Sequence, residues 1–188
     1  MARPKSDDKR NAILSAAIRV IAAQGLSAPT AAIASEAGVS NGSLFTYFAS
    51  KSDLLNQLYI ELKAEMAAVA LAGVVADSGI REQLFQMWSH WLRWAVSHPD
   101  RRRALAQLGV SGEVTPASHQ SGSESMAGVA RLLQRSLENG AMRDTPPGFV
   151  SALMNALADT TIDFMIQDPA HAEDHCQAGF EALSRMIG

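Results

Sequence analysis

The chain has almost no cysteine: Cys176 is the only one among 188 residues. An internal disulfide is therefore impossible, which agrees with a reducing compartment. Long apolar runs are also missing, because no stretch approaches the roughly 18 uncharged apolar residues of a membrane span, and no secretory signal pattern opens the chain. These absences predict a cytoplasmic protein that has no membrane partner.

Catalytic and metal-binding patterns are equally scarce. There is no Gly-rich phosphate loop, no nucleophile elbow and no pair of carboxylates in a plausible catalytic setting. His171 and His175 would share a helical face, but a metal site needs three or four converging ligands, and no further ligand can be identified. We therefore expect no catalytic residue, no metal and no cofactor.

What the chain does have is an uneven distribution of charge. Its net charge is −3, yet residues 1–52 carry six basic and three acidic side chains, a net charge of +3. The remaining residues carry ten basic and sixteen acidic side chains, a net charge of −6. A basic N-terminal segment on an acidic remainder is expected of a protein that contacts phosphate groups at one end.

The most informative stretch is residues 30–51, whose apolar residues fit two short helices joined by a tight turn. Ile33 and Ala34 would lie on the inner face of the first helix, and Leu44 and Phe48 on that of the second. This is the pattern of a helix-turn-helix, in which the second helix enters the DNA major groove and the first crosses the backbone.

Capping residues lie where such a motif needs them. Thr30 is placed to cap the first helix, because its hydroxyl can accept a free backbone N–H. Gly38 can adopt the left-handed conformation that ends a helix, and Ser40 can cap the second helix. The predicted turn is therefore Gly38 to Ser40.

Many positions between residues 11 and 55 also agree in order and spacing with a known pattern. They are Ile13, Ala16, Ala17, Gly25, Ile33, Ala34, Ala37, Gly38, Val39, Ser40, Gly42, Leu44, Phe45, Tyr47, Phe48, Lys51, Leu54 and Leu55. In these residues the chain resembles the DNA-binding domain of the TetR family of bacterial transcriptional regulators. One departure is Phe45, where the family usually has tyrosine; a phosphate contact by that hydroxyl would be lost, and Tyr47 would carry more of that role.

The resemblance and the helical periodicity together imply an all-α protein of about nine helices. A three-helix DNA-binding head would occupy residues 1–52, and a helical ligand-binding and dimerisation domain would occupy residues 53–188. From residue 51 onward, apolar periodicity together with proline, glycine and capping residues at the helix ends predicts helices at residues 51–70, 80–97, 99–108, 115–139, 146–167 and 168–186. Ser121–Ser123 is a poor helix interior, so the fourth of these is expected to start late or bend there.

Roles in DNA binding follow from the resemblance and from the geometry of the motif. Ser40, Asn41, Ser43 and Thr46 are predicted at or near base edges, Asn41 because its amide can pair with adenine. A second group is predicted on phosphates, where contacts give affinity but no sequence choice: Thr30, Tyr47 and Lys51. Structural alternatives remain open, since Tyr47 could simply pack and Thr30 could only cap.

The effector site is predicted from a concentration of aromatic residues. All three tryptophans fall within residues 88–94, and the apolar side chains of this helix cover more than one stripe. We expect an effector pocket lined by Phe85, Trp88, Trp91, Met126 and Met154, which would favour an apolar or aromatic ligand. The alternative is that these residues form ordinary core.

Two apolar sides on the helix at residues 146–167 predict a further partner. One side can serve the core, and the other requires a second cover, which a copy of the last two helices would provide in a four-helix bundle. The predicted function is a homodimeric repressor that binds a palindromic DNA operator and is released by a small molecule. An all-α enzyme with an incidental helix-turn-helix and a purely structural dimerisation module remain as alternatives.

Overall fold

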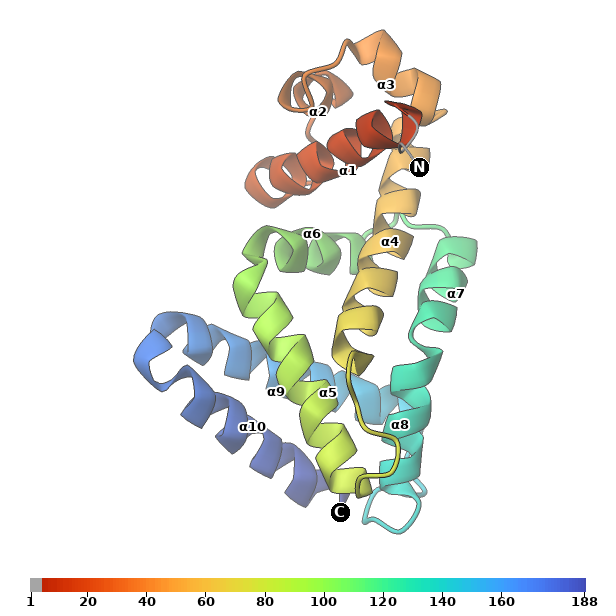
Figure 1. The fold of residues 1–188 in the computed structure, drawn as a ribbon. Helices are drawn as coiled ribbons and strands as arrows, with labels where there is room; N and C mark the ends of the chain where they lie inside the picture. The colour runs from red at the N-terminus through yellow and green to blue at the C-terminus, as the bar shows by residue number, and fades with distance from the viewer. Residues whose placement is uncertain (1–4) are drawn as a thin grey trace. The chain divides into compact units, whose positions relative to one another are not determined.

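The computed structural model describes residues 5–188, and this part of the chain contains α-helices, one short 3-10 helix and no strand. In chain order the elements are α1 (Lys5–Gln24), α2 (Thr30–Glu36), α3 (Asn41–Tyr47), α4 (Lys51–Leu71), α5 (Ile80–Ser97), α6 (Pro99–Gly109), α7 (Pro116–Ser125), α8 (Ala127–Leu137), α9 (Pro147–Gln167), η1 (Pro169–His171) and α10 (Ala172–Ile187). Figure 1 labels the α-helices. The all-α prediction is confirmed, with ten α-helices in the described part.

The chain folds into two compact units. The N-terminal unit comprises the chain up to Ala64 together with His98–Glu124, and the C-terminal unit comprises Glu65–Ser97 together with Ser125–Gly188. The long helix α4 contributes residues to both units, whereas α7 reaches the C-terminal unit only with its last residue, Ser125. The predicted boundary at residue 52 separates a DNA-binding domain from a ligand-binding and dimerisation domain. This functional boundary is a different division from that of the two compact units, and it stays a prediction.

In the N-terminal unit, α1 packs against α2 and α6 around an apolar core. Ile13, Ala17 and Ile21 recur along α1 at helical spacing and are almost completely buried. Arg10 joins α1 to α4, because its guanidinium lies 2.6 Å from a Glu61 carboxylate oxygen and 5.5 Å from the centre of the Phe48 ring. The helices around the helix-turn-helix are thus fixed by apolar packing and by one partly buried cation.

The predicted helix at residues 115–139 is two helices, and the expected position of the break is wrong. α7 continues through Ser121–Ser123, and the chain leaves helical geometry at Met126 instead. Packing explains why glycine is tolerated inside α7: a Cβ atom at Gly122 would lie 2.8 Å from the Tyr59 ring on α4. Glycine therefore permits a close approach of α7 to α4, a contact that local propensity does not reveal.

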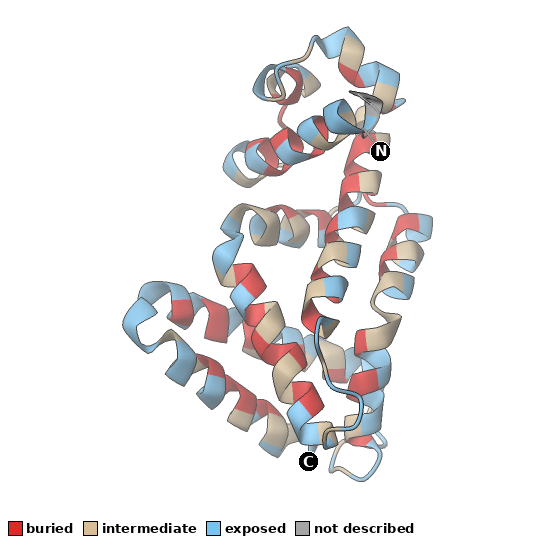
Figure 2. Ribbon diagram, in the orientation of Figure 1, coloured by how far each residue is buried: buried red, intermediate tan, exposed pale blue. Residues whose placement is uncertain are grey.

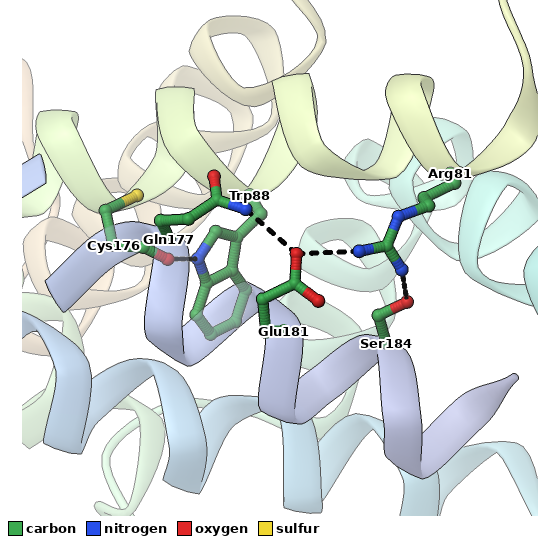
Figure 3. A network of polar contacts seen from close by, with 6 residues as sticks. All are labelled: Arg81, Trp88, Cys176, Gln177, Glu181 and Ser184. Carbon is green, nitrogen blue, oxygen red and sulfur yellow. Dashed lines mark hydrogen bonds and ion pairs between the residues drawn. The ribbon is translucent and has the colours of Figure 1, made fainter. Parts of the chain in front are cut away.

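In the C-terminal unit, α5 is a central helix that contacts α8, α9 and α10. Trp88 is fully buried, and its indole Nε1–H donates a hydrogen bond of 3.1 Å to the Cys176 carbonyl oxygen of α10. On the outer side of the same contact, Arg81 donates hydrogen bonds to Glu181, at 2.7 Å, and to Ser184 (Figure 3). These contacts hold α10 along α5.

The helix α9 combines a buried side with an apolar outer side. Met154, Ala158, Ile162 and Met165 are buried, while Phe149, Phe164 and Ile166 are 56%, 52% and 43% exposed. By length and mean hydropathy alone, α9 is the one described helix that could cross a membrane, a criterion that core helices of soluble proteins also meet; 33% of its window is buried. These apolar side chains stay partly exposed in the single chain, and the exposed polar residues Asp159, Thr160 and Asp163 interrupt the apolar surface.

Candidate nucleic-acid interface

The backbone of residues 30–48 forms the tight helical corner predicted from the sequence. α2 ends at Glu36 with Ala37 as its C-cap, and Gly38 adopts the left-handed conformation with φ of +69°. Val39 N–H then donates to the Ala34 carbonyl at 3.0 Å, which closes the turn. Ser40 is the N-cap of α3, with its side-chain oxygen accepting the Ser43 N–H at 3.1 Å. The predictions for Gly38 and for the Ser40 cap are confirmed.

The predicted cap at Thr30 is wrong. Thr30 is the first residue inside α2, and the N-cap position belongs to Pro29, which makes no side-chain cap bond. Pro29 has the extended backbone of an N-cap residue, and its carbonyl accepts the Ala32 N–H at 3.0 Å. Thr30 therefore lies half-buried in the first turn of α2, where its predicted phosphate contact stays a prediction.

The second helix of the motif presents a polar and largely uncovered face. Asn41, Gly42, Phe45 and Thr46 are exposed, Ser43 is half-buried, and Leu44 is buried in the core. Figure 2 shows α3 mostly in the colour of exposed residues. At 100° per residue, the four exposed positions fall within about 140° of the helix circumference, so they form one continuous stripe. We call these four residues the α3 stripe.

The predicted base-contacting residues differ in how far they are already engaged. Ser40 accepts a hydrogen bond within the cap, so its hydroxyl hydrogen remains the group it can offer to DNA. Thr46 donates to the Gly42 carbonyl at 3.4 Å, a long bond that an external acceptor could replace. Asn41 projects from the first turn of α3, where base-reading residues of a helix-turn-helix lie.

Two of the predicted phosphate ligands lie at the junction of α3 and α4. Tyr47 is the last residue of α3, and its ring packs against the core of the N-terminal unit, so the packing alternative holds at least for the ring. Lys51 is the first residue of α4, after the N-cap Ser50, whose hydroxyl accepts the Asp53 N–H at 3.0 Å. Asp53 in turn accepts the Ala49 N–H at 2.9 Å, as in a capping box that reaches one residue further back.

Two of the basic side chains of this segment are already paired. Arg10 pairs with Glu61, and Arg19 pairs with Glu36 on α2 at 2.6 Å. Within the described residues, Lys9 and Lys51 form no ion pair. The two arginines are thus engaged within the protein, and Lys51 is the motif's own cation that remains available to a phosphate.

The five predicted effector residues all lie in the C-terminal unit. Trp88 and Trp91 meet edge to face with ring centres 6.0 Å apart, and Phe85 packs against Phe180 of α10 at 4.9 Å. Met154 is buried in α9, and Met126 is half-buried where α7 gives way to α8. Trp88 is held in the core by its hydrogen bond to α10, so ordinary core remains the alternative for this residue.

Sequence reasoning missed a polar residue that shapes the N-terminal unit. Asn56 on α4 is buried, and its amide donates to the Glu113 carbonyl at 2.9 Å and accepts the Thr115 N–H at 2.8 Å. It therefore clamps the loop between α6 and α7 to α4. Phe180 was also missed. Like Asn56, it contacts a residue that is distant in sequence, Phe85 of α5, and no local pattern indicates such a pair.

The histidines and the cysteine do not form a reactive centre. Among the described residues, no group of three or more His, Cys, Asp or Glu side chains could hold a metal ion. Burial raises the pKa of the Cys176 thiol, which disfavours the reactive thiolate. Asp168 accepts hydrogen bonds from the imidazoles of His175 and His171, and these bonds lower the pKa of its carboxyl.

Fold and site together define an all-α, helix-turn-helix DNA-binding protein, and comparison with known proteins makes the class specific. Residues 13–58 match the model of the tetR family of bacterial regulatory proteins. A putative tetR-family regulator from Shewanella sp. PV-4 is 25% identical, with a TM-score of 0.84 over 95% of this chain and 97% of that one.

Two further solved structures share the fold at lower sequence identity. A TetR-family regulator from Marinobacter aquaeolei VT8 is 21% identical, with a TM-score of 0.83 over 99% of this chain and 98% of that one. LfrR from Mycobacterium smegmatis, solved in complex with proflavine, is 19% identical, with a TM-score of 0.70 over 96% and 98% of the two chains. Residues 13–58 therefore carry the DNA-binding domain of the tetR family, and the chain as a whole shares the fold of solved tetR-family regulators. Regulators of this family are DNA-binding transcription factors and not enzymes, which decides against the enzyme alternative.

Proposed function

We propose that the protein binds a palindromic operator as a homodimer and acts as a cytoplasmic repressor released by a small apolar or aromatic effector. The observation that carries the proposal is the α3 stripe: exposed Asn41, Gly42, Phe45 and Thr46 on a short helix that Leu44 and the Gly38 turn fix to a packed core. A helix held in this way can enter a major groove while its buried residues stay packed in the core.

Contacts to bases and to phosphates would divide between the two ends of the motif. Ser40, Asn41, Ser43 and Thr46 lie at or beside the exposed side of α3 and would contact base edges. Thr30, Tyr47 and Lys51 lie at the first turn of α2 and at the junction of α3 with α4, and they would contact phosphates. The first group would determine which sequence is bound, and the second would determine affinity and its salt dependence.

The proposed dimer rests on the outer side of α9. Phe149 and Phe164 expose more than half of their surface, and Leu153 and Leu157 between them are only half-buried. A second copy of α9 and α10 would cover this surface in a four-helix bundle. Twofold symmetry would then place two copies of α3 roughly 34–36 Å apart, or a multiple of that distance, to meet successive major grooves.

The proposed effector follows from the aromatic side chains of α5. Phe85, Trp88 and Trp91, with Met126 and Met154, form the proposed lining, and a small-molecule effector is supported by LfrR, a protein of the same fold that was solved in complex with proflavine. The effector would favour the dimer geometry that fits the operator poorly. It can shift binding only by its difference in affinity for the two geometries, about tenfold for each 1.4 kcal/mol.

Two alanine variants test the assigned roles. Lys51→Ala should weaken binding to every DNA sequence and reduce the slope of log affinity against log salt by roughly 0.9 per subunit, because one phosphate contact is lost. Asn41→Ala should chiefly relax sequence choice at one position of each half-site. A suitable charge control is Arg143→Ala, an exposed arginine of the C-terminal unit, which should leave both quantities unchanged.

Fluorescence anisotropy with labelled duplexes at several salt concentrations measures both quantities. Equal losses for Asn41→Ala and Lys51→Ala on every sequence would show that the two roles are wrongly assigned. Absence of binding to any duplex, by wild-type protein with its helices intact in circular dichroism, would contradict the proposed function itself.

A further inference from the structure

The helix that carries the proposed base contacts also exposes an aromatic ring. Phe45 is 42% exposed, and it is the one large hydrophobic side chain exposed within residues 30–51, all of which the structure describes. The other hydrophobic residues of this segment, such as Leu44 and Phe48, are buried in the core of the unit. An exposed phenyl ring on a small, otherwise polar face points to a partner outside the chain.

The Phe45 ring lies within the α3 stripe and not at its border. With Asn41 set at 0°, the rotation of 100° per residue places Phe45 at about 40°, Gly42 at about 100° and Thr46 at about 140°. Phe45 therefore has Asn41 on one side and Gly42 and Thr46 on the other. A duplex that contacts Asn41 and Thr46 would also cover the ring.

The chemistry of the ring restricts what it can contact there. A phenyl group has no hydrogen-bond donor, so it cannot serve a phosphate oxygen as a tyrosine hydroxyl would. The apolar group that a major groove presents on its base edges is the 5-methyl of thymine, and phenylalanine is one of the side chains that pack against it. We infer that Phe45 is a specificity-determining residue that selects thymine at one position of each half-site by packing against its 5-methyl group.

The neighbouring glycine supports close approach at this place. A Cβ atom built at Gly42 would meet no atom within 4 Å, and Gly42 does not have the positive φ that favours glycine. Nothing within the described chain therefore requires glycine at this helical position, where it is unfavourable. A base edge beside the Phe45 ring would use the space that a side chain at position 42 would fill.

This inference rests on the proposed function, and its test starts from duplexes that the full-length protein selects from random DNA. Each thymine of the best half-site is replaced in turn by deoxyuridine, which removes only the 5-methyl group. For the wild-type protein, replacing one particular thymine in a single half-site should weaken binding about fourfold, the value for one buried methyl group, and replacing it in both half-sites should weaken binding about fifteenfold. All other replacements should have smaller effects.

The variants assign that effect to the ring. Phe45→Ala should bind the thymine and the deoxyuridine duplexes equally, whereas Phe45→Leu, which keeps an apolar side chain, should retain part of the preference. Arg143→Ala, at an exposed residue of the C-terminal unit, should keep the full preference and serves as the control. Because Phe45 and Arg143 are both exposed, all three variants should retain the wild-type circular dichroism spectrum and melting temperature within about 2 °C.

The possible failures are distinguishable. If wild-type protein selects no duplex at all, the proposed function fails, and the inference fails with it. If the protein selects duplexes that contain no thymine in the half-site, or if every deoxyuridine replacement is silent, the assignment of Phe45 alone is wrong. A preference for thymine that survives in Phe45→Ala would likewise overturn the assignment.

Discussion

Gly42→Ala should make the protein more stable and a weaker DNA binder. Gly42 is the second residue of α3, its backbone is not left-handed, and a methyl group there would project into open space. Alanine in a helix is favoured over glycine by about 0.5–1 kcal/mol, because an unfolded chain with alanine at this position has less conformational freedom to lose on folding than one with glycine. For a chain of 188 residues this corresponds to a rise of about 1–4 °C in melting temperature.

The same methyl group should weaken DNA binding if α3 lies in a major groove. Inserting a methyl group into a closely packed contact costs about 1–3 kcal/mol, which corresponds to roughly a 5- to 150-fold weaker affinity. The assays are thermal unfolding followed by circular dichroism and anisotropy titration with the selected duplex. An affinity equal to that of the wild type would refute the close approach of this part of α3 to DNA.

Gly38→Ala is the matched control, because it adds the same methyl group with the opposite effect on folding. A Cβ atom at Gly38 would also meet nothing within 4 Å, but the φ of Gly38 is +69°. Alanine in this left-handed conformation costs about 1–2 kcal/mol, so the melting temperature should fall. If both variants shift stability in the same direction, backbone conformation does not control stability at these glycines, and the reasoning is wrong.

Three further predictions concern the C-terminal unit. Gly179→Ala should lower the free energy of unfolding by about 1–3 kcal/mol in a urea titration, because its Cβ would lie 2.9 Å from Thr161 Cγ2 and 3.1 Å from the Trp88 ring; a loss below 0.5 kcal/mol would show that α10 can move away easily. The Arg81 guanidinium holds the pKa of the Glu181 carboxyl below its usual value. The charged pair therefore stabilises the fold at pH values above about 4.3, the pKa of a glutamate in the unfolded chain, and this stabilisation is lost as the pH falls through the lower pKa that Glu181 has in the folded protein. Glu181→Gln should therefore melt at a lower temperature than wild type at pH 7, and the difference should shrink below about pH 4; a difference that is constant with pH would contradict the cause. Phe164→Glu should shift the sedimentation of the protein from dimer to monomer while Phe164→Leu leaves the dimer intact, because Phe164 is 52% exposed on the outer side of α9; an unchanged dimer would place the interface elsewhere.

Much of the fold was predictable because its signals are local. The bounds of α5, at Ile80 and Ser97, follow from the apolar periodicity and from Pro99, and the cap at Ser40 follows from a short polar side chain before an apolar helix. The start of α4 follows from the Ser50 and Asp53 pair in the same way. Such features depend on residues within one or two helical turns, which a single sequence displays.

The errors arose where a distant contact, or a competition between adjacent residues, decides the local structure. Helix α7 persists through Gly122 because Tyr59 of α4 packs against it, and no pattern near residue 122 reveals that neighbour. Thr30 is not a cap because Pro29 already occupies the N-cap position, a competition between two neighbouring candidates that propensity does not resolve. Sequence distance likewise hid the clamp of Asn56 on the loop between α6 and α7.

The candidate site was predictable only as a surface. The spacing of Leu44 and Phe48 fixes which side of α3 is buried, and therefore which side is exposed. The sequence did not show that Arg10 and Arg19 are held by Glu61 and Glu36, because those carboxylates come from other helices. The contacts proposed for Ser40, Asn41, Ser43, Thr46, Thr30, Tyr47 and Lys51 depend on the bound duplex and stay predictions.

Selection of bound duplexes from random DNA by the full-length protein tests the central claim most directly. Two copies of α3 related by twofold symmetry should enrich an inverted repeat whose half-sites are centred about 10–10.5 base pairs apart, or a multiple of that spacing. Enrichment of a single asymmetric site would contradict the account. So would a failure of correctly folded protein to enrich any sequence from the random pool.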